Sequence, residues 1–285
     1  MQMAWFQVSF FSASLMRTVP VNVLLPDLMG PPELLKEPRK PLRSLYLLNG
    51  YRGDHTDWLL NTDVNGWSRK YQCAIIMPSG ENCSYVDMPL SGAKYSQFIG
   101  QELVDFTRKL FPLSHAREDT AISGLSMGGY GALHNGLRCS EVFGHVLPLS
   151  FGMRGPEGVV DEASRLRFEA MYGPLESWDT NSANPYFLAQ EILAGRKPMT
   201  DLYIACGYND SLCVGNRKYH HFLEEAGFPH VYEEGPGSHE WGFWRWALPR
   251  ALDHCGWATD DSFVNPMWTD MRDERYLPEE LKGGK

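Results

Sequence analysis

One serine lies in a sequence context that suits a nucleophile. The segment Gly124-Leu-Ser126-Met-Gly128 has the pattern G-x-S-x-G, after a short apolar run and before a stretch of small residues. A strand that turns sharply into a helix exposes a serine hydroxyl, and the glycines let backbone approach backbone at the strained turn. The alternative is a glycine-rich turn with an inert serine. The flanking pattern favours Ser126 as a nucleophile.

A serine hydroxyl is a weak nucleophile and needs a base that is itself oriented by a third group. His239 lies in a glycine-rich loop between a predicted strand near Val231 and a predicted helix. Asp210 follows the predicted strand 202–206, at the carboxyl end where ligands bind in open α/β sheets. Asp201 lies at the opposite end of that strand, so we expect Asp210 to be the acid and His239 the base.

Metal chemistry is a weaker interpretation of the same sequence. His220 and Glu224 have the spacing of metal ligands on a helix, but a solvated helix face is the simpler explanation and the one we favour. We therefore expect no metal and no cofactor.

Acyl chemistry also needs donors for a developing oxyanion. The N–H of Met127, directly after the nucleophile, is one candidate. The loop 48–53 supplies the other, and we select the N–H of Tyr51, although a plain glycine turn remains the alternative. Trp58 and Trp241 flank these loops, so we expect them to bind substrate.

Several segments resemble the putative-esterase family, and most closely its bacterial tributyrin esterases and short-chain acetyl esterases. They are Gln7-Val-Ser-Phe-Phe-Ser, Val23-Leu-Leu-Pro, Leu48-Asn-Gly-Tyr-Arg-Gly-Asp-His-Thr-Asp-Trp58, Gly124-Leu-Ser-Met-Gly-Gly-Tyr-Gly-Ala-Leu133 and Gly237-Ser-His-Glu-Trp241. The family also includes relatives of esterase D, of feruloyl and acetylxylan esterases and of the antigen 85 acyltransferases.

The resemblance covers about residues 4–255 and implies an α/β-hydrolase fold. It supports Ser126, Asp210 and His239 as the triad, with Met127 and Tyr51 as oxyanion donors. One position differs, because the family usually has His-Gly before the oxyanion loop and this chain has Asn49-Gly50. The donor is a backbone group, so we expect activity to survive with altered hydrogen bonds in the loop.

The remaining pattern predicts the elements that position these residues. Alternating apolar residues predict antiparallel strands over 5–11 and 19–25, and short apolar runs predict buried strands over 44–48, 73–77, 120–122, 146–149 and 202–206. Apolar residues at helical spacing predict helices over 98–110, 128–138, 212–225 and 241–254. Alternating strands and helices indicate an α/β fold with a mostly parallel central sheet covered by helices on both faces.

Residues 152–198 interrupt this alternation and suggest a helical cap inserted in a single domain, residues 1–255. Residues 256–285 form an acidic C-terminal extension, and Trp257, Phe263, Trp268 and Tyr276 could pack on the body or on a second subunit. A homo-oligomer is therefore possible, and a frayed tail is equally consistent with the sequence.

The composition and net charge of the chain indicate which kinds of binding partner are disfavoured. The 285 residues carry 26 basic and 35 acidic side chains, a net charge of −9 that disfavours nucleic acid and anionic membranes. The chain has six scattered cysteines, and we find neither a signal-peptide pattern nor an apolar run that could span a membrane. We expect reduced thiols, a soluble cytoplasmic protein and a small-molecule or saccharide ester as substrate.

The leading hypothesis is a serine carboxylesterase for short acyl chains, from acetyl to butyryl. The alternatives are a feruloyl or acetylxylan esterase acting on plant cell-wall esters, a thioesterase of the S-formylglutathione hydrolase kind, and acyl transfer to an alcohol. A catalytically silent binding protein on the same fold is the hypothesis from a different class.

Overall fold

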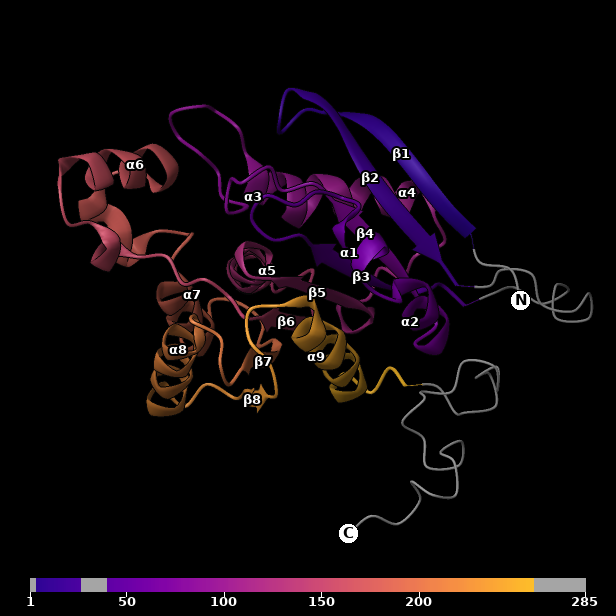
Figure 1. Ribbon diagram of the computed structural model, residues 1–285. Coiled ribbons are helices and arrows are strands. Elements are labelled where there is room, and N and C mark those ends of the chain that lie inside the picture. The colour runs from indigo at the N-terminus through magenta and orange to yellow at the C-terminus, as the bar shows by residue number, and fades with distance from the viewer. Residues whose placement is uncertain (1–3, 27–39, 259–285) are drawn as a thin grey trace, which may run out of the picture.

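An eight-stranded sheet forms the centre of the computed structural model, which describes residues 4–26 and 40–258 (Figure 1). In chain order the strands are β1 (Ala4–Ser12), β2 (Arg17–Leu25), β3 (Arg43–Leu48), β4 (Cys73–Pro78), β5 (Thr120–Leu125), β6 (His145–Leu149), β7 (Asp201–Gly207) and β8 (Val231–Gly235). Their order across the sheet is β1-β2-β4-β3-β5-β6-β7-β8. β1 and β2 pair antiparallel, as do β2 and β4, while the strands from β4 to β8 run parallel. This confirms the predicted mostly parallel α/β sheet.

The inner strands are mostly apolar because helices cover both faces of the sheet. In β3, Tyr46 and Leu48 pack into the core on one face, and Leu45 and Leu47 pack into the core on the other. Successive side chains of a strand point to opposite faces, so each strand contributes to both cores. Burial of each such side chain stabilises the fold by about 1.5–3 kcal/mol before the entropy of ordering is counted.

The helices other than the short α3 divide between these two faces. Among the described residues they are α1 (Asp57–Asn61), α2 (Val64–Lys70), α4 (Leu103–Leu110), α5 (Met127–Arg138), α6 (Glu162–Tyr172), α7 (Pro185–Leu193), α8 (Cys213–Ala226) and α9 (Trp241–His254). Buried residues of α4, α5, α7 and α8 join the core that contains Tyr46, and those of α1, α2 and α9 join the core that contains Leu45. The predicted helices over 98–110, 128–138, 212–225 and 241–254 are therefore present, with small shifts at their ends.

Two local features differ from the sequence expectation. The predicted helix over 98–110 is extended by the short α3 (Tyr95–Gln97) and includes a π-helical turn over Phe98–Glu102. The short helices α1 and α2 were not predicted, because neither is long enough to show a helical period.

The stretch 152–198 is helical, as expected for an insertion. It holds α6, α7 and two 3-10 turns, Pro156–Gly158 and Leu175–Thr180, and α6 stands at the outer side of the molecule (Figure 1). Three aromatic rings, Phe168, Tyr172 and Trp178, pack against one another with centroids 4.9–5.4 Å apart. These rings are at most 8% exposed and belong to the same buried core as Tyr46, so the insertion packs against the main body.

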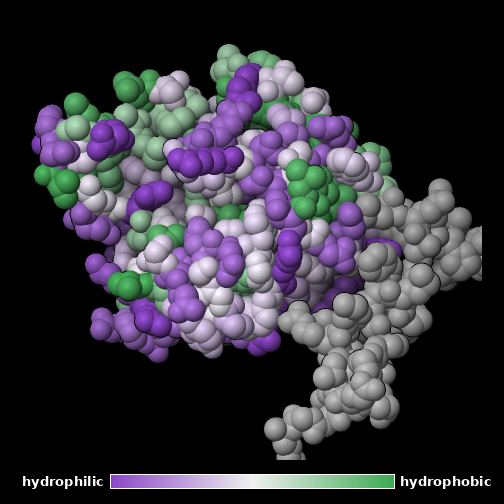
Figure 2. Space-filling view, in the orientation of Figure 1, coloured by the Kyte–Doolittle hydropathy of each residue, from purple (hydrophilic) through white to green (hydrophobic). Residues whose placement is uncertain are grey.

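The surface agrees with the charge balance of the sequence. The face in Figure 2 is mostly hydrophilic to neutral, with separate hydrophobic patches and no continuous apolar belt. No helix among the described residues is long and apolar enough to cross a membrane. Within the C-terminal extension, Trp257 packs on the body and is 2% exposed, whereas Phe263, Trp268 and Tyr276 lie outside the described residues.

Candidate active site

Ser126 lies at a strained turn between β5 and α5. Its φ of 57° and ψ of −114° fall in a region that non-glycine residues rarely adopt, which costs about 1–3 kcal/mol. Backbone hydrogen bonds hold the turn: the Ser126 N–H donates to Leu149 O at 3.0 Å, and the Gly152 N–H donates to Ser126 O at 3.2 Å. The end of β6 and the residues after it therefore fix the serine in a partly exposed, strained position.

The glycine after the elbow is required by close packing. A Cβ on Gly128 would lie 2.5 Å from both Leu48 O and Asn49 O. These atoms belong to the backbone and have little freedom to move. Gly128 thus lets α5 start directly against the end of β3, where the predicted oxyanion loop begins.

Two hydrogen bonds join the three predicted triad residues. His239 Nε2 lies 2.9 Å from Ser126 Oγ, and His239 Nδ1 lies 2.8 Å from Asp210 Oδ2. A carboxylate only accepts, so Nδ1 carries the hydrogen and Nε2 presents its lone pair to the serine hydroxyl. The arrangement can therefore take a proton from Ser126 without any change of tautomer.

Asp210 is held as a buried carboxylate. Its side chain is 0% exposed, and the Leu212 N–H donates to Oδ1 at 2.8 Å. Burial alone would raise the pKa of Asp210, but hydrogen bonds from His239, from the Leu212 N–H and from Ser150 outweigh it and hold the pKa below its usual value. Asp210 is consequently ionised at neutral pH and can stabilise a positive charge on His239.

The loops that carry the acid and the base are bonded to each other. The Tyr208 N–H donates to Gly235 O at 2.9 Å, and the Asn209 N–H donates to Gly237 O at 3.0 Å. Gly237 has a φ of 127°, which favours glycine. Asp201, in contrast, begins β7 at the far end of the strand, so the structure agrees with its exclusion as the acid.

The predicted oxyanion loop lies beside the serine. A Cβ built on Gly50 would be 3.6 Å from the Ser126 Cβ, which places the loop after β3 against the elbow. The Met127 N–H is the first of helix α5 and therefore has no partner within the helix. The positive end of the helix dipole also favours a negative charge at this point. The Tyr51 and Met127 N–H groups thus remain the candidate oxyanion donors.

Asn49 supplies the altered hydrogen bonds expected in this loop. Its side chain donates from Nδ2 to Gly50 O at 2.8 Å, and its Oδ1 accepts from the Gly80 N–H at 3.0 Å and from the Tyr85 hydroxyl at 2.9 Å. Asn82 Oδ1 accepts from the Arg52 N–H at 2.6 Å on the other side of the loop. Hydrogen bonds from the segment 80–85 thus hold the oxyanion loop at two points, Asn49 and Arg52.

That supporting segment is itself strained. Glu81, Asn82, Ser84 and Tyr85 all have positive φ, between 44° and 58°. Strain of this kind persists only where surrounding contacts over-determine the backbone, and it gathers at functional sites. We infer that the segment 80–85 is a positioning element for Tyr51.

Replacing Tyr85 with phenylalanine tests this support. The change removes the hydroxyl that bonds Asn49, and we expect kcat to fall about tenfold with little change in KM, because a misplaced oxyanion donor weakens the transition state more than the ground state. Tyr46→Phe is the matched control, since Tyr46 is equally buried but bonds Thr107 away from the loop. Equal losses in the two variants, measured by steady-state kinetics, would contradict a positioning role for Tyr85.

The two predicted substrate-binding tryptophans differ in exposure. Trp58 is 1% exposed and donates from Nε1 to Leu48 O at 3.0 Å, so it fastens the end of β3 from within the core. Contact between Trp58 and substrate stays a prediction, and its ring is buried in this structure. Trp241 is partly exposed and packs edge-on against Trp58, with ring centroids 5.3 Å apart. Trp241 is thus the more accessible of the two candidates for contact with substrate.

Sequence reasoning missed two residues that hold the base. The ring of Trp244 lies edge-on to His239 at 5.1 Å, and its Nε1 donates to Ser150 Oγ at 3.2 Å. Ser150 has a φ of 44° and follows the carboxyl end of β6. The rule that selected Asp210, a polar residue directly after a parallel strand, would also have selected Ser150.

Comparison with known proteins identifies the family of the chain. The model of the family described as Putative esterase matches residues 12–255. An acetyl esterase of Caldicellulosiruptor saccharolyticus is 33% identical over 90% of this chain and 100% of its own length. The structure of S-formylglutathione hydrolase FrmB from Staphylococcus aureus is 29% identical, with a TM-score of 0.77 over 90% of this chain and 99% of that one.

A ferulic acid esterase shares the fold, with a TM-score of 0.72 and 24% identity over 89% of this chain and 97% of that one. The family match extends from the end of β1 to the residue after α9 and so includes the elbow, the acid and the base. The chain therefore belongs to the putative-esterase family of α/β-hydrolases and is a carboxylic ester hydrolase.

Proposed function

We propose that this protein hydrolyses short-chain acyl esters through an acyl-enzyme on Ser126. The observation that carries the proposal is the continuous hydrogen-bond chain from Ser126 through His239 to the buried Asp210. A hydroxyl, a correctly oriented imidazole and a buried carboxylate are the three parts that nucleophilic acyl transfer requires.

In the proposed reaction, Ser126 Oγ attacks the ester carbonyl while His239 Nε2 takes the hydroxyl proton. The carbonyl oxygen becomes an oxyanion held by the N–H groups of Met127 and Tyr51, each worth about 2.7–4 kcal/mol in the transition state. The C–O bond to the alcohol then breaks, and His239 returns the proton to the leaving oxygen. Water, activated by His239, attacks the acyl-enzyme and releases the acid and Ser126.

A preference for short acyl groups has two supports. The insertion starts at the nucleophile, because Gly152 bonds Ser126 O, and the buried ring of Phe151 lies directly before it. A packed wall cannot accept added methylenes without strain. The 33% identical relative is named an acetyl esterase, which agrees with this preference.

Rates on a small ester panel test the substrate class. We expect kcat/KM for phenyl acetate and a butyryl ester to exceed that for an octanoyl ester by at least about tenfold, since each methylene without space costs of order 1 kcal/mol. Methyl ferulate and S-formylglutathione complete the panel. Preference for the octanoyl ester would overturn the short-chain proposal. Preference for ferulate or for the thioester would assign the site to those substrates instead, and the resemblance to FrmB makes the thioester the second candidate.

The pH dependence follows from the proposed base. We expect kcat/KM to fall in acid with the slope of one proton, because protonated His239 cannot accept the serine proton. Asp210 adds no second step, since its lowered pKa keeps it ionised to below about pH 4. Initial rates between about pH 4.5 and 8 measure the profile. A slope of two protons, or a constant rate, would contradict this assignment.

Removal of metal ions by EDTA also tests the proposed reaction. No step of the acyl-enzyme reaction uses a metal, so brief treatment with EDTA should leave the initial rate at room temperature unchanged. A rate lost on chelation and restored by zinc would instead place a metal in the reaction.

A further inference from the structure

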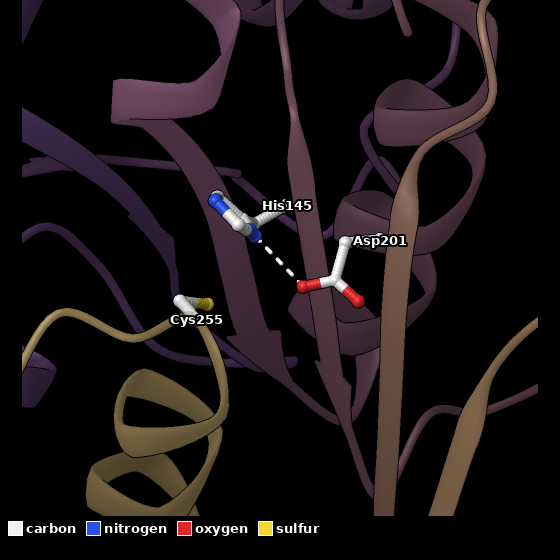
Figure 3. Close-up of side chains that lie close together, drawn as sticks. All are labelled: His145, Asp201 and Cys255. Carbon is white, nitrogen blue, oxygen red and sulfur yellow. Dashed lines mark hydrogen bonds and ion pairs between the residues drawn. The ribbon is translucent and has the colours of Figure 1, made fainter.

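A second group of chemically reactive side chains lies at the opposite edge of the sheet from Ser126. His145 begins β6, Asp201 begins the adjacent β7, and Cys255 directly follows α9. Their ligand atoms, an imidazole nitrogen, a carboxylate oxygen and a thiol sulfur, all lie within 4.8 Å of one another. Figure 3 shows the sulfur of Cys255 directed toward the His145–Asp201 pair. The cluster lies at the amino ends of β6 and β7, whereas Ser126 lies at the carboxyl ends of the parallel strands. The length of β6, about 13 Å, therefore separates the two groups.

The orientation of His145 calls for a positive charge between it and Asp201. Its Nε2 lies 3.0 Å from Glu118 O, a carbonyl that only accepts, so Nε2 carries a hydrogen. In the neutral ring Nδ1 then presents a lone pair, yet it faces a carboxylate oxygen of Asp201 at 2.8 Å. Two acceptors repel at this distance unless a proton or a cation lies between them.

His145 and Asp201 also have the outer hydrogen-bond partners that are typical of metal ligands. Histidine ligands commonly donate their second N–H to a carbonyl, as His145 does to Glu118 O, and ligating carboxylates are themselves hydrogen-bonded. The second oxygen of Asp201 lies 2.8 Å from His254 Nε2. These contacts fix the direction of the His145 and Asp201 ligand atoms before an ion arrives.

We propose that His145, Asp201 and Cys255 form a binding site for a zinc-like divalent ion that joins the end of α9 to the amino ends of β6 and β7. Nitrogen and sulfur ligands favour zinc over magnesium or calcium. In a tetrahedral zinc site the ligand atoms lie about 3–4 Å apart, so side-chain shifts of order 1 Å would complete it, with water as the fourth ligand.

At Cys255 the ion would displace the thiol proton and one weak hydrogen bond. The thiol donates a weak hydrogen bond to Ala251 O at 3.2 Å, which a bond to the ion would replace. The thiolate and the Asp201 carboxylate together balance two positive charges, and His145 remains neutral. The side chains of His145 and Asp201 are 15% and 38% exposed, so an ion can reach them from solvent.

A second group of possible metal ligands, on α8, is more exposed to solvent. His220, His221 and Glu224 all lie on α8, and the side chains of His221 and Glu224 are 67% and 55% exposed. Long exposed side chains lose rotamer entropy when they gather on an ion. The ligands of the cluster at β6 and β7 belong to three segments of the fold, so the surrounding structure restricts their side chains more than it restricts those on α8.

Zinc titration of the full chain, after chelation and dialysis, tests the proposal. Calorimetry should detect one zinc ion per chain at the His145 site, and zinc at about 100 times its Kd should raise Tm by about 5 °C or more. Cobalt in place of zinc should give a thiolate charge-transfer band, because Cys255 supplies sulfur.

Three variants locate the ion. Cys255→Ala should weaken zinc binding by about 100-fold or more and abolish the cobalt band and the rise in Tm. Cys139→Ala is the matched cysteine control, and His221→Asn removes the group on α8. Both should bind zinc at the His145 site as the unaltered chain does. If Cys255→Ala does not fold, the cobalt spectrum of the unaltered chain still tests for a sulfur ligand.

Two results would overturn the proposal. Zinc could fail to bind or to raise Tm, which would leave His145 and Asp201 as a hydrogen-bonded pair without an ion. Alternatively, zinc binding could survive Cys255→Ala and disappear in His221→Asn, which would place the ion on α8.

Discussion

Replacing Ser126 with alanine should lower kcat by roughly 10⁴- to 10⁶-fold, because the proposed acyl-enzyme forms on its hydroxyl. His239→Ala should have an effect of similar size, since Ser126 then lacks its base at 2.9 Å. The two losses should not add, because the residues act as one unit. Steady-state rates on phenyl acetate measure both variants, and circular dichroism with Tm confirms that each is folded.

Ser123→Ala is the matched control for the serine variant. Ser123 lies on β5 just before the elbow and is buried, and its hydroxyl donates to Leu147 O at 2.7 Å, away from His239. We expect its kcat to remain within about tenfold of the unaltered chain. Substantial activity in a folded Ser126→Ala variant would remove the serine from the mechanism.

Asp210→Asn should reduce kcat by about 10⁴-fold while leaving the fold intact. The amide has no negative charge to stabilise protonated His239, and its NH₂ group can reverse the tautomer that points Nε2 at Ser126. The loss should fall on kcat more than on KM, because the charge on His239 exists only during the reaction.

Asp63→Asn is the control for loss of a carboxylate elsewhere. Asp63 caps α2 by accepting from the Gly66 N–H, a role that asparagine also performs. Its kcat should be unchanged. Near-normal activity in Asp210→Asn together with a large loss in Asp201→Asn would transfer the acid to the other end of β7.

The catalytic residues could be selected from the sequence because topology places them together. Ser126 follows β5 and Asp210 follows β7, and the carboxyl ends of parallel strands share one edge of the sheet. The loop of His239 follows β8, the next strand along. Apolar runs and turn residues thus carry enough information to bring these three side chains to one edge.

The residues that position the loops around the site could not be predicted from the sequence in this way. Tyr85 and Asn82 adopt positive φ without glycine, because hydrogen bonds to the distant segment 49–52 outweigh their local preference. Trp58 belongs to a loop motif that also suits substrate contact, and only the packed core decides that it is buried. Such features depend on tertiary contacts, and residue type and spacing do not reveal them.

The central claim is that Ser126 is the nucleophile, and covalent labelling tests it most directly. The full chain is treated with a fluorophosphonate, and the modified peptide is mapped by mass spectrometry. We predict one adduct per chain, on Ser126, with loss of esterase activity in proportion to labelling and no adduct in Ser126→Ala or after unfolding. An adduct on another residue that abolishes activity, or full activity after Ser126 is labelled, would contradict the account.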